Sequence, residues 1–314
     1  MPPATQNDGS ALRGIVLLAV LSLFWGLGWP AMKVVLAEIR PWTFRTVCLL
    51  CAGAGLLALA RAAGTRLRIP RSDLIPLLVT SLVNITGWHL LSAHGIAAMQ
   101  AGRAAIVAYT MPLWTVLLSR LLLGERLGWL RLLALATGTA GMAVLLGPDL
   151  QRLGAAPAGV AFMLGAAFCW AAGTVLVKFF RWHTPPAAIV GWQMLLGGLP
   201  VAAGALLLES PLGLADISLK AGATLLYLVM GPMIFCHWAF FVVVRLFPAN
   251  VAAISTLSIP IIGVFSSALL LGEPVTTAEL LALLLVVAAL GLTSAGRSGP
   301  GPQSHEERDR CSER

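Results

Sequence analysis

Two histidines inside long apolar stretches of the sequence are the side chains there most able to exchange a proton. His89 and His237 lie 148 residues apart, and each is next to a tryptophan, Trp88 or Trp238. A neutral imidazole both donates and accepts hydrogen bonds, and its ordinary pKa of about 6.5 lies near physiological pH. Ionisable residues within a membrane usually face the protein interior. The pair is predicted to line a polar interior path, although a packed, hydrogen-bonded histidine is an equally good interpretation of each.

Carboxylates are placed differently from these histidines. No Asp or Glu lies in the middle of an apolar run, and residues such as Glu38, Glu125 and Glu273 fall at the ends of runs. A proton relay made of carboxylates is therefore not expected. If the protein moves a solute together with protons, His89 or His237 would have to carry the protons. Otherwise the movement would be facilitated diffusion or exchange. No cysteine or carboxylate groups with histidine at metal-ligand spacing, apart from the adjacent Cys236 and His237, so we expect no metal, no cofactor and no enzyme activity.

Aromatic side chains supply a second kind of candidate site, because the chain has 10 Trp and only 2 Tyr. Tryptophan faces accept apolar groups or cations, and Asn, Tyr and Ser side chains near them would add hydrogen bonds. Packing between helices or against lipid is the alternative for each ring. The candidate substrate-binding residues are Trp25, Trp29, Asn84, Trp88, His89, Tyr109, Trp170, His237, Trp238 and Ser255.

Helix-breaking residues inside the apolar runs mark where the helices could bend. Pro112 and Pro260 are 148 residues apart, and each leaves the carbonyl four residues back without its usual partner. We interpret both as kinks facing a central cavity, with an ordinary packing kink as the alternative. The predicted bending points of a gate are Gly26, Pro30, Pro112, Pro232 and Pro260.

The composition shows what must position these residues. Of the 314 residues, 58% are hydrophobic and 11% are charged, whereas a soluble protein has roughly 25% charged residues. Many runs have the length of about 18 residues that is needed to cross a bilayer, and the first is expected to be an uncleaved span. We therefore predict an all-α integral membrane protein with ten transmembrane helices. The predicted spans are 14–36, 43–61, 74–96, 101–121, 130–147, 157–178, 186–208, 221–244, 250–271 and 276–295.

The chain contains an internal repeat. Without a gap, 13 of 37 positions are identical between His89–Glu125 and His237–Glu273. A second match places Trp25, Trp29 and Lys33 against Trp170, Thr174 and Lys178 at the same spacing. Because each half has five spans, an odd number, the second copy must cross the membrane in the opposite sense. Two inverted five-helix repeats are typical of transporters.

Charge and turn residues divide the chain further. If the N-terminus is cytoplasmic, 15 of the 21 Lys and Arg residues lie on the inner side, so both termini are predicted to be cytoplasmic. Lys33 and Lys178 are interpreted as reaching opposite interfaces. The net charge of +8 resides mainly in short loops, which argues against nucleic acid as a partner. The predicted segments are a polar tail 1–13, a first repeat 14–147, a linker 148–156, a second repeat 157–296 and a disordered tail 297–314.

Several of these motifs together resemble a known family. The run Phe24 to Trp29 followed by Lys33, the Leu-Leu-Gly-Glu ending at Glu125 with Pro112 before it, and the second copies resemble the EamA family of the drug/metabolite transporter superfamily, over about residues 14–296. The resemblance implies ten helices around a cavity lined by helices 1, 3, 4, 6, 8 and 9. It also implies export of amino acids or related amphipathic metabolites across an inner membrane. The second copy departs from the pattern, since it lacks the Trp-Gly pair and a counterpart of Pro30.

We therefore predict a secondary transporter that works by alternating access. Its expected partners are a small-molecule substrate and the lipid bilayer, and we allow for a homodimer. A lipid scramblase and a non-transporting membrane scaffold are the alternatives. A membrane enzyme acting on lipid would need a metal cluster or an activated nucleophile, for which the sequence offers no pattern.

Overall fold

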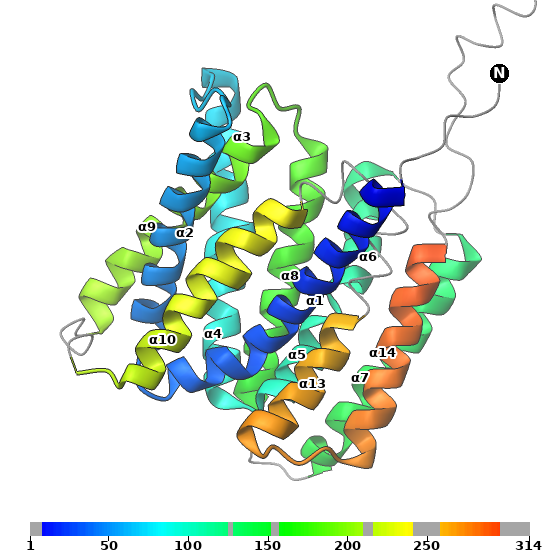
Figure 1. Cartoon of the computed structure of the whole chain (residues 1–314). Coiled ribbons are helices and arrows are strands. Elements are labelled where there is room, and N and C mark those ends of the chain that lie inside the picture. The colour runs from blue at the N-terminus through cyan, green and yellow to red at the C-terminus, as the bar shows by residue number, and fades with distance from the viewer. Residues whose placement is uncertain (1–7, 125–127, 152–156, 210–215, 241–257, 296–314) are drawn as a thin grey trace, which may run out of the picture.

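The computed structural model describes residues 8–124, 128–151, 157–209, 216–240 and 258–295, and these ranges contain helices but no strand (Figure 1). Seven helices are long and apolar enough to cross a membrane, and three shorter apolar helices accompany them. The predicted all-helical membrane protein is confirmed at this level.

Helices follow one another along the whole described chain. Up to residue 151 they are α1 (Asp8–Leu36), α2 (Pro41–Ala62), α3 (Arg71–Thr80), η1 (Ser81–Gly87), α4 (Trp88–Ala98), α5 (Ala101–Ala108), α6 (Met111–Leu123) and α7 (Trp129–Gln151). After residue 156 they are α8 (Pro157–Phe179), α9 (Pro186–Leu208), α10 (Leu219–Leu228), η3 (Val229–Phe235), α13 (Ser258–Leu271) and α14 (Thr277–Ala295). The elements η1 and η3 are π-helical, and each continues an α-helix before and after it.

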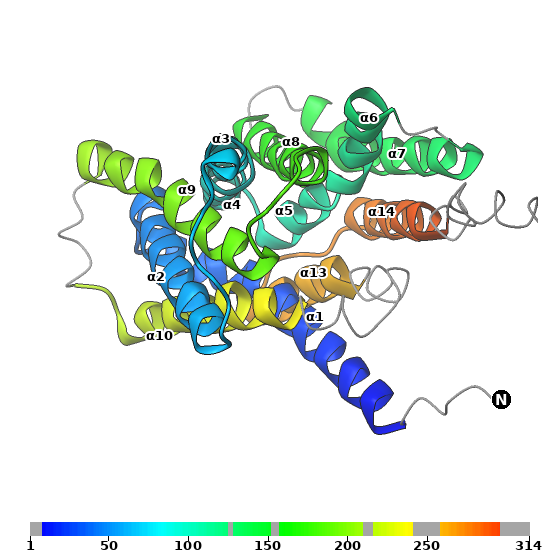
Figure 2. The same ribbon diagram turned by 90° about the horizontal axis from the view of Figure 1, so that it is seen from above.

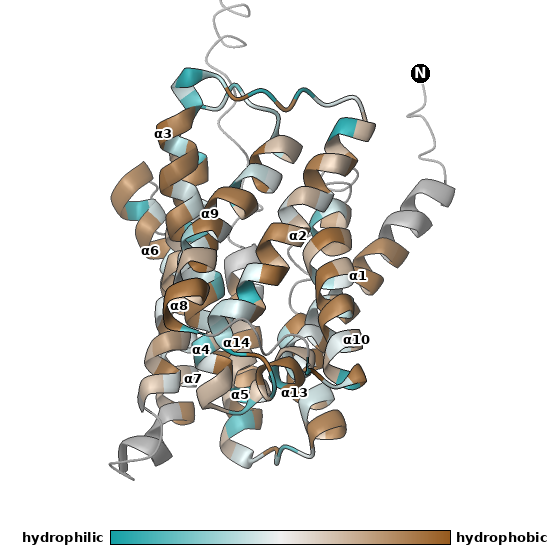
Figure 3. Ribbon diagram, turned by 90° about the vertical axis from the view of Figure 1, so that its left-hand side faces the viewer, coloured by the Kyte–Doolittle hydropathy of each residue, from teal (hydrophilic) through white to brown (hydrophobic). Residues whose placement is uncertain are grey.

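The hydropathy of the helices explains this choice of structure. Apolar residues cover the lengths of the helices, and hydrophilic residues gather toward the loops at the two ends (Figure 3). No water is available in the apolar layer to pair with backbone N–H and C=O groups, so a spanning segment must satisfy them internally as a helix.

The helices pack as two outer pairs around a central group. The pair α2 and α9 lies at one side and the pair α7 and α14 at the other (Figure 2). Between them, α1 contacts α10, η3, α13 and α5, while α8 contacts η1, α4, α5 and α6. The described central elements come from both parts of the chain, so α1 and α8 are each enclosed by helices of the other part.

Glycines allow the closest of these contacts. A Cβ at Gly53 of α2 would lie 2.9 Å from the backbone N of Leu195 in α9. A Cβ at Gly197 of α9 would lie 2.8 Å from the carbonyl oxygen of Ser81. Small residues at helix interfaces let backbones approach and gain van der Waals contact where no hydrophobic effect favours association.

The two π-helical segments occupy equivalent places in the sequence repeat. Their starts and their ends are both 148 residues apart, since 229 − 81 = 148 and 235 − 87 = 148. This is the offset between His89 and His237, each of which comes two residues after its π-helical segment. Such segments are uncommon and are frequently found at functional sites.

The two segments reach the same geometry from different residues. In η3, Pro232 has no N–H and cannot donate to the helix ladder. In η1, which contains no proline, Ser81 Oγ donates to Leu77 O at 2.6 Å alongside the Ser81 backbone N–H, and Thr86 Oγ1 donates to Gly197 O of α9 at 2.7 Å. A serine bond of the first kind often bends a helix. The bend at Pro232 was predicted, whereas nothing in the sequence pattern singled out residues 81–87.

The predicted bend near Pro112 takes the form of a break. Helix α5 ends at Ala108 and α6 begins at Met111, with Tyr109 and Thr110 between them. Pro112 lies in the first turn of α6, where its missing N–H has no helical partner to lose. Pro112 therefore lies just after the break, within the helix that follows it.

We expect Gly53→Ala to lower the thermal stability of the purified protein in detergent. The added methyl group meets the backbone of α9, which cannot move without shifting the helix, and overpacking of this kind costs about 1–3 kcal/mol. Gly291→Ala in α14 is the matched control, because nothing lies within 4 Å of a Cβ there. Equal melting temperatures for the two variants would contradict the close α2–α9 packing.

Candidate functional site

The residues around His237 form a compact, hydrogen-bonded cluster. Trp25 Nε1 on α1 donates to the carbonyl oxygen of Pro232 at 3.0 Å, and His237 Nδ1 lies 3.2 Å from the same oxygen. The Trp25 and His237 rings meet edge to face at 5.9 Å. The structure thus brings together three of the predicted residues, from α1 and from the interrupted helix that includes η3.

The equivalent positions around His89 are less well satisfied. The repeat aligns Asn84 with Pro232 and Trp170 with Trp25, and the rings of Trp88 and Trp170 meet at 5.1 Å. Asn84 packs against Gly173 of α8. Its Oδ1 atom is buried without a hydrogen-bond partner among the described residues. The same is true of both ring nitrogens of His89, whose side chain is only 4% exposed. Buried polar atoms normally have a partner, so this place is suited to a polar ligand or water.

The other predicted site residues lie in different surroundings. Trp29 is buried against α13, where its ring touches the position of a Cβ on Gly263. Tyr109 packs beside the same core at the α5–α6 break. Trp238 is 46% exposed and contacts Phe235 rather than Trp25. Ser255 lies outside the described residues. Trp29 and Tyr109 thus belong to one packed cluster, which also includes Trp88.

The predicted bending residues also differ in their local structure. Pro30 lies within the continuous helix α1, and Gly26 of the same helix packs closely on Ile262 of α13. Pro232 lies within η3, and Pro260 lies within the described part of α13. A gating role for any of them stays a prediction.

Sequence reasoning missed Arg45, which looked like one more interfacial cation. Its side chain lies in α2 and is only 4% exposed. Its Nε donates to the carbonyl oxygen of His89 at 2.8 Å, and its Nη2 donates to Ser92 Oγ at 3.0 Å. An Arg one turn into an apolar helix is a weak signal, because a long side chain there usually extends toward water.

Lys33, which was predicted to reach an interface, binds the end of a helix. Lys33 Nζ lies 2.8 Å from the carbonyl oxygen of Ile96 and 2.7 Å from that of Met99, at the C-terminus of α4. The last carbonyls of a helix have no helical partner and carry partial negative charge, which a cation satisfies.

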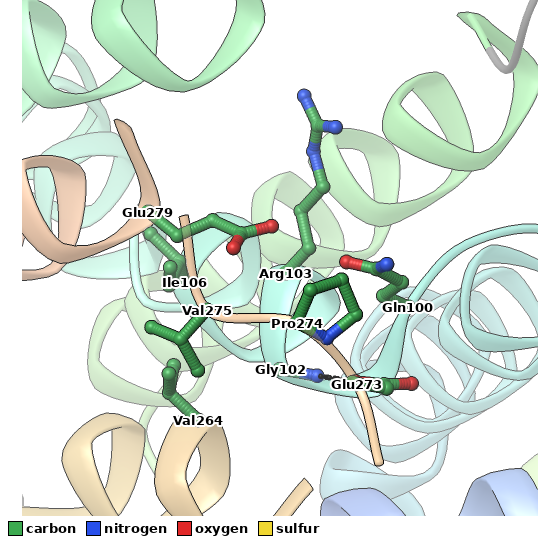
Figure 4. A pocket seen from close by; sticks show the side chains of 9 residues that line it. All are labelled: Gln100, Gly102, Arg103, Ile106, Val264, Glu273, Pro274, Val275 and Glu279. Atoms are coloured by element: carbon green, nitrogen blue, oxygen red, sulfur yellow. Dashed lines mark hydrogen bonds between the residues drawn. The ribbon is translucent and has the colours of Figure 1, made fainter. Parts of the chain in front are cut away.

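At the start of the next helix, α5, a carboxylate binds backbone N–H groups. Glu273, after α13, accepts hydrogen bonds from the backbone N–H groups of Ala101 at 2.8 Å and Gly102 at 3.0 Å, at the start of α5. Figure 4 shows Glu273 against Gly102 in a small recess, with the Arg103 side chain extending away from it. Arg103 donates to Leu145 O of α7 at 2.6 Å. Lys33 and Glu273 thus connect α1, α4, α5 and α13 at one end of the bundle.

Two further carboxylates join the halves in a reciprocal way. Glu38, after α1, accepts from Ser218 N at 2.7 Å and from Ser218 Oγ at 2.6 Å, just before α10. Asp73, in the first turn of α3, accepts from His183 N at 2.9 Å and Thr184 N at 2.8 Å, between α8 and α9. Helix α10 begins 148 residues after α3, and Trp170 of α8 lies 145 residues after Trp25 of α1, so the two contacts join corresponding segments of the repeat. In each contact, the segment that follows α1 or α8 meets the start of α10 or α3, and the acid is on opposite partners.

The contact at Glu38 responds to pH in a direction that its hydrogen bonds determine. The bonds from the Ser218 side chain and backbone hold the pKa of Glu38 below its ordinary value. A carboxyl group with a lowered pKa in the folded protein stabilises it when ionised. This contribution is present at neutral pH and is lost as the pH falls through the folded-state pKa.

A fourth carboxylate caps a helix across the first outer pair. Glu209, after α9, accepts from Thr43 N at 2.7 Å and from Trp42 N at 3.1 Å, at the start of α2. Helices α2 and α9 are thus joined by this charged cap as well as by their close glycine contacts.

Together these features define a multi-pass helical membrane protein whose ends are held by charged caps and whose interior carries paired polar positions, which is the class of a transporter. The chain belongs to the EamA-like transporter family, because the family profile matches residues 12–147 and 157–295.

Comparison with individual proteins agrees with this family. The chain is 29% identical to the "Uncharacterized transporter YvbV" of Bacillus subtilis (strain 168), over 90% of this chain and 92% of that one. It is also 29% identical to a "Probable amino-acid metabolite efflux pump" of Salmonella typhimurium, over 90% of this chain and 95% of that one. A crystal structure matches with a TM-score of 0.65 and 22% identity, covering 92% of this chain and 99% of the other, which supports the fold alone.

We expect Asp73→Ala to lower the melting temperature of the purified protein. The change removes a buried acceptor from the N–H groups of His183 and Thr184, and hydrogen bonds to charged groups contribute about 1.5–3 kcal/mol. Asp216→Ala is the control, because Asp216 is exposed just before α10. The capping role of Asp73 fails if both variants unfold at the wild-type temperature.

Proposed function

We propose that this protein is a secondary transporter that exports amino acids or related amphipathic metabolites by alternating access. Its membership of a transporter family supports transport, and the printed name of the Salmonella relative supports the substrate class. The same relatives favour a location in an inner membrane and a function in transport rather than in catalysis.

The arrangement that we propose is ten helices in two inverted five-helix repeats, with both termini cytoplasmic. The observation that carries it is the pair of π-helical segments at one offset of 148 residues, each crossed by a helix of the other half. The contacts of Glu38 and Asp73 support it too, because two inverted copies bring corresponding segments together at both membrane faces. Two related halves can form two similar states, one open to each side.

The candidate site suggests how such a cycle would use these residues. Helix α1 is joined to η3 by the Trp25–Pro232 hydrogen bond. Helix α8 packs on η1 where Gly173 meets Asn84, and on the start of α4 where Trp170 meets Trp88. A solute bound between the halves would contact both π-helical segments. Movement of α1 and α8 relative to these segments would then expose the solute to one side or the other, while Lys33 and Glu273 hold one end closed.

The test is a flux assay in proteoliposomes over a panel of amino acids and related metabolites. We expect export of at least one compound, and we expect Trp25→Phe to reduce its rate. That variant keeps a ring against His237 but loses the hydrogen bond to Pro232, and a net hydrogen bond of about 0.5–1.5 kcal/mol corresponds to a loss of roughly two- to tenfold.

Trp129→Phe is the matched control, because Trp129 is 71% exposed at the start of α7. It should transport at the wild-type rate. Absence of flux for every compound, with folded wild-type protein, would contradict the proposed function and favour a scaffold, and flux of lipid between leaflets would favour a scramblase.

A further inference from the structure

The guanidinium group of Arg45 is a buried cation surrounded by neutral partners. Its donors reach the His89 carbonyl oxygen, Ser92 Oγ and, at 3.2 Å, the sulfur of Met32. The ring of Phe44 lies under it, with the guanidinium carbon 4.7 Å from the ring centroid. Within the described chain, no carboxylate forms an ion pair with Arg45.

A buried charge without a counterion is costly, so its retention calls for a compensating group. Hydrogen bonds to neutral acceptors recover only part of the lost hydration of an ion. A planar guanidinium has five N–H donors in a fixed fork that matches a carboxylate. Arg45 uses only part of that fork on its neutral neighbours.

The side chain of His89, next to Arg45, also lacks hydrogen-bond partners among the described residues. Arg45 binds the backbone carbonyl of His89, while both ring nitrogens of His89 are buried and have no partner within the described chain. One ring nitrogen of a neutral histidine donates and the other accepts. A group that accepts from both Arg45 and the His89 N–H would satisfy free donors of both side chains at once.

The equivalent place in the other half is already complete. His237 Nδ1 is paired with the Pro232 carbonyl oxygen. The residue aligned with Arg45 is Val190 at an offset of 145, or Gln193 at an offset of 148, and the Gln193 amide donates to Thr80 Oγ1 at 2.8 Å. Among the described residues, a buried cation next to an unsatisfied histidine therefore occurs around His89 and not around His237.

We propose that Arg45, held in place by Ser92, binds the carboxylate group of the transported solute together with the imidazole of His89. This inference rests on the proposed transport function and specifies its substrate class: compounds with a carboxylate and an apolar body, rather than amines or neutral amphipathic molecules. The carboxylate neutralises the guanidinium and accepts the free donors, while Met32 and Phe44 supply apolar surface beside it. The site belongs to one half only, so the solute binds in one orientation.

The experiment measures competition for transport in liposomes of phosphatidylcholine alone. The labelled solute is the one identified by the flux assay. The competitors are three phenyl compounds that differ only in their charged groups: phenylalanine, 3-phenylpropionate and phenethylamine, with the matching compounds of leucine and tryptophan. We expect the carboxylates to compete at least about tenfold better than the amines, as a charge-assisted pair implies.

The variants separate binding from folding. Arg45→Gln should raise the KM of the labelled solute at least about tenfold and abolish the preference for carboxylates, and Arg45→Lys should restore part of both. Ser92→Ala keeps the cation and should raise KM by a smaller factor, so it tests the site if Arg45→Gln does not fold. Arg40→Gln removes an equal charge from an exposed position before the same helix and should leave transport unchanged.

Each contrary result has a distinct meaning. Amines that compete as well as carboxylates, or a folded Arg45→Gln variant with the wild-type KM and selectivity, would overturn the carboxylate site while leaving transport intact. An effect of Arg45→Gln that requires added phosphatidylglycerol would assign the anion to a lipid headgroup and overturn the solute site. Absence of flux for every compound in the wild type would remove the proposed function itself and this inference with it.

Discussion

Backbone and side-chain polar groups in the apolar layer have to find partners inside the protein, and this constraint shapes every special feature of the described chain. Within η3, the Trp25 side chain and His237 meet the Pro232 carbonyl. Where the ladder opens in η1, Thr86 donates to a carbonyl of α9. The places left unpaired, at Asn84 and His89, therefore stand out as positions where a further molecule belongs.

The same constraint accounts for the way in which the two parts of the chain hold each other. Helix ends expose N–H and C=O groups that need partners, and these come mainly from the other half of the chain. Glu273 caps α5 and Glu209 caps α2, each across more than 160 positions of sequence. Because the caps lie at helix ends rather than at mid-depth, they join the halves without placing a carboxylate along the interior path.

The sequence predicted the apolar helices, the repeat and the weak points at Pro112 and Pro232, because hydrophobic runs and proline have direct structural consequences. It did not predict η1, which contains no proline that would mark it. It also did not predict the burial of Arg45, because one cation near a helix start has the same pattern whether it faces water or the interior. Carboxylates such as Asp73 were placed at span ends, but their partners lie more than 100 positions away and could not be identified from local pattern.

The different origins of the two π-helical segments have a mechanical consequence. A π turn holds one extra residue, so converting it to α-helix would rotate the following helix on the order of 100° about its axis. In η3, Pro232 has no N–H, so the ladder through that segment lacks one bond in either form. No proline lies in η1, so every residue there keeps an N–H that can donate in either form. Conversion to α-helix would therefore leave the backbone ladder complete in the half that carries Arg45 and His89, and one bond short in the half that carries His237.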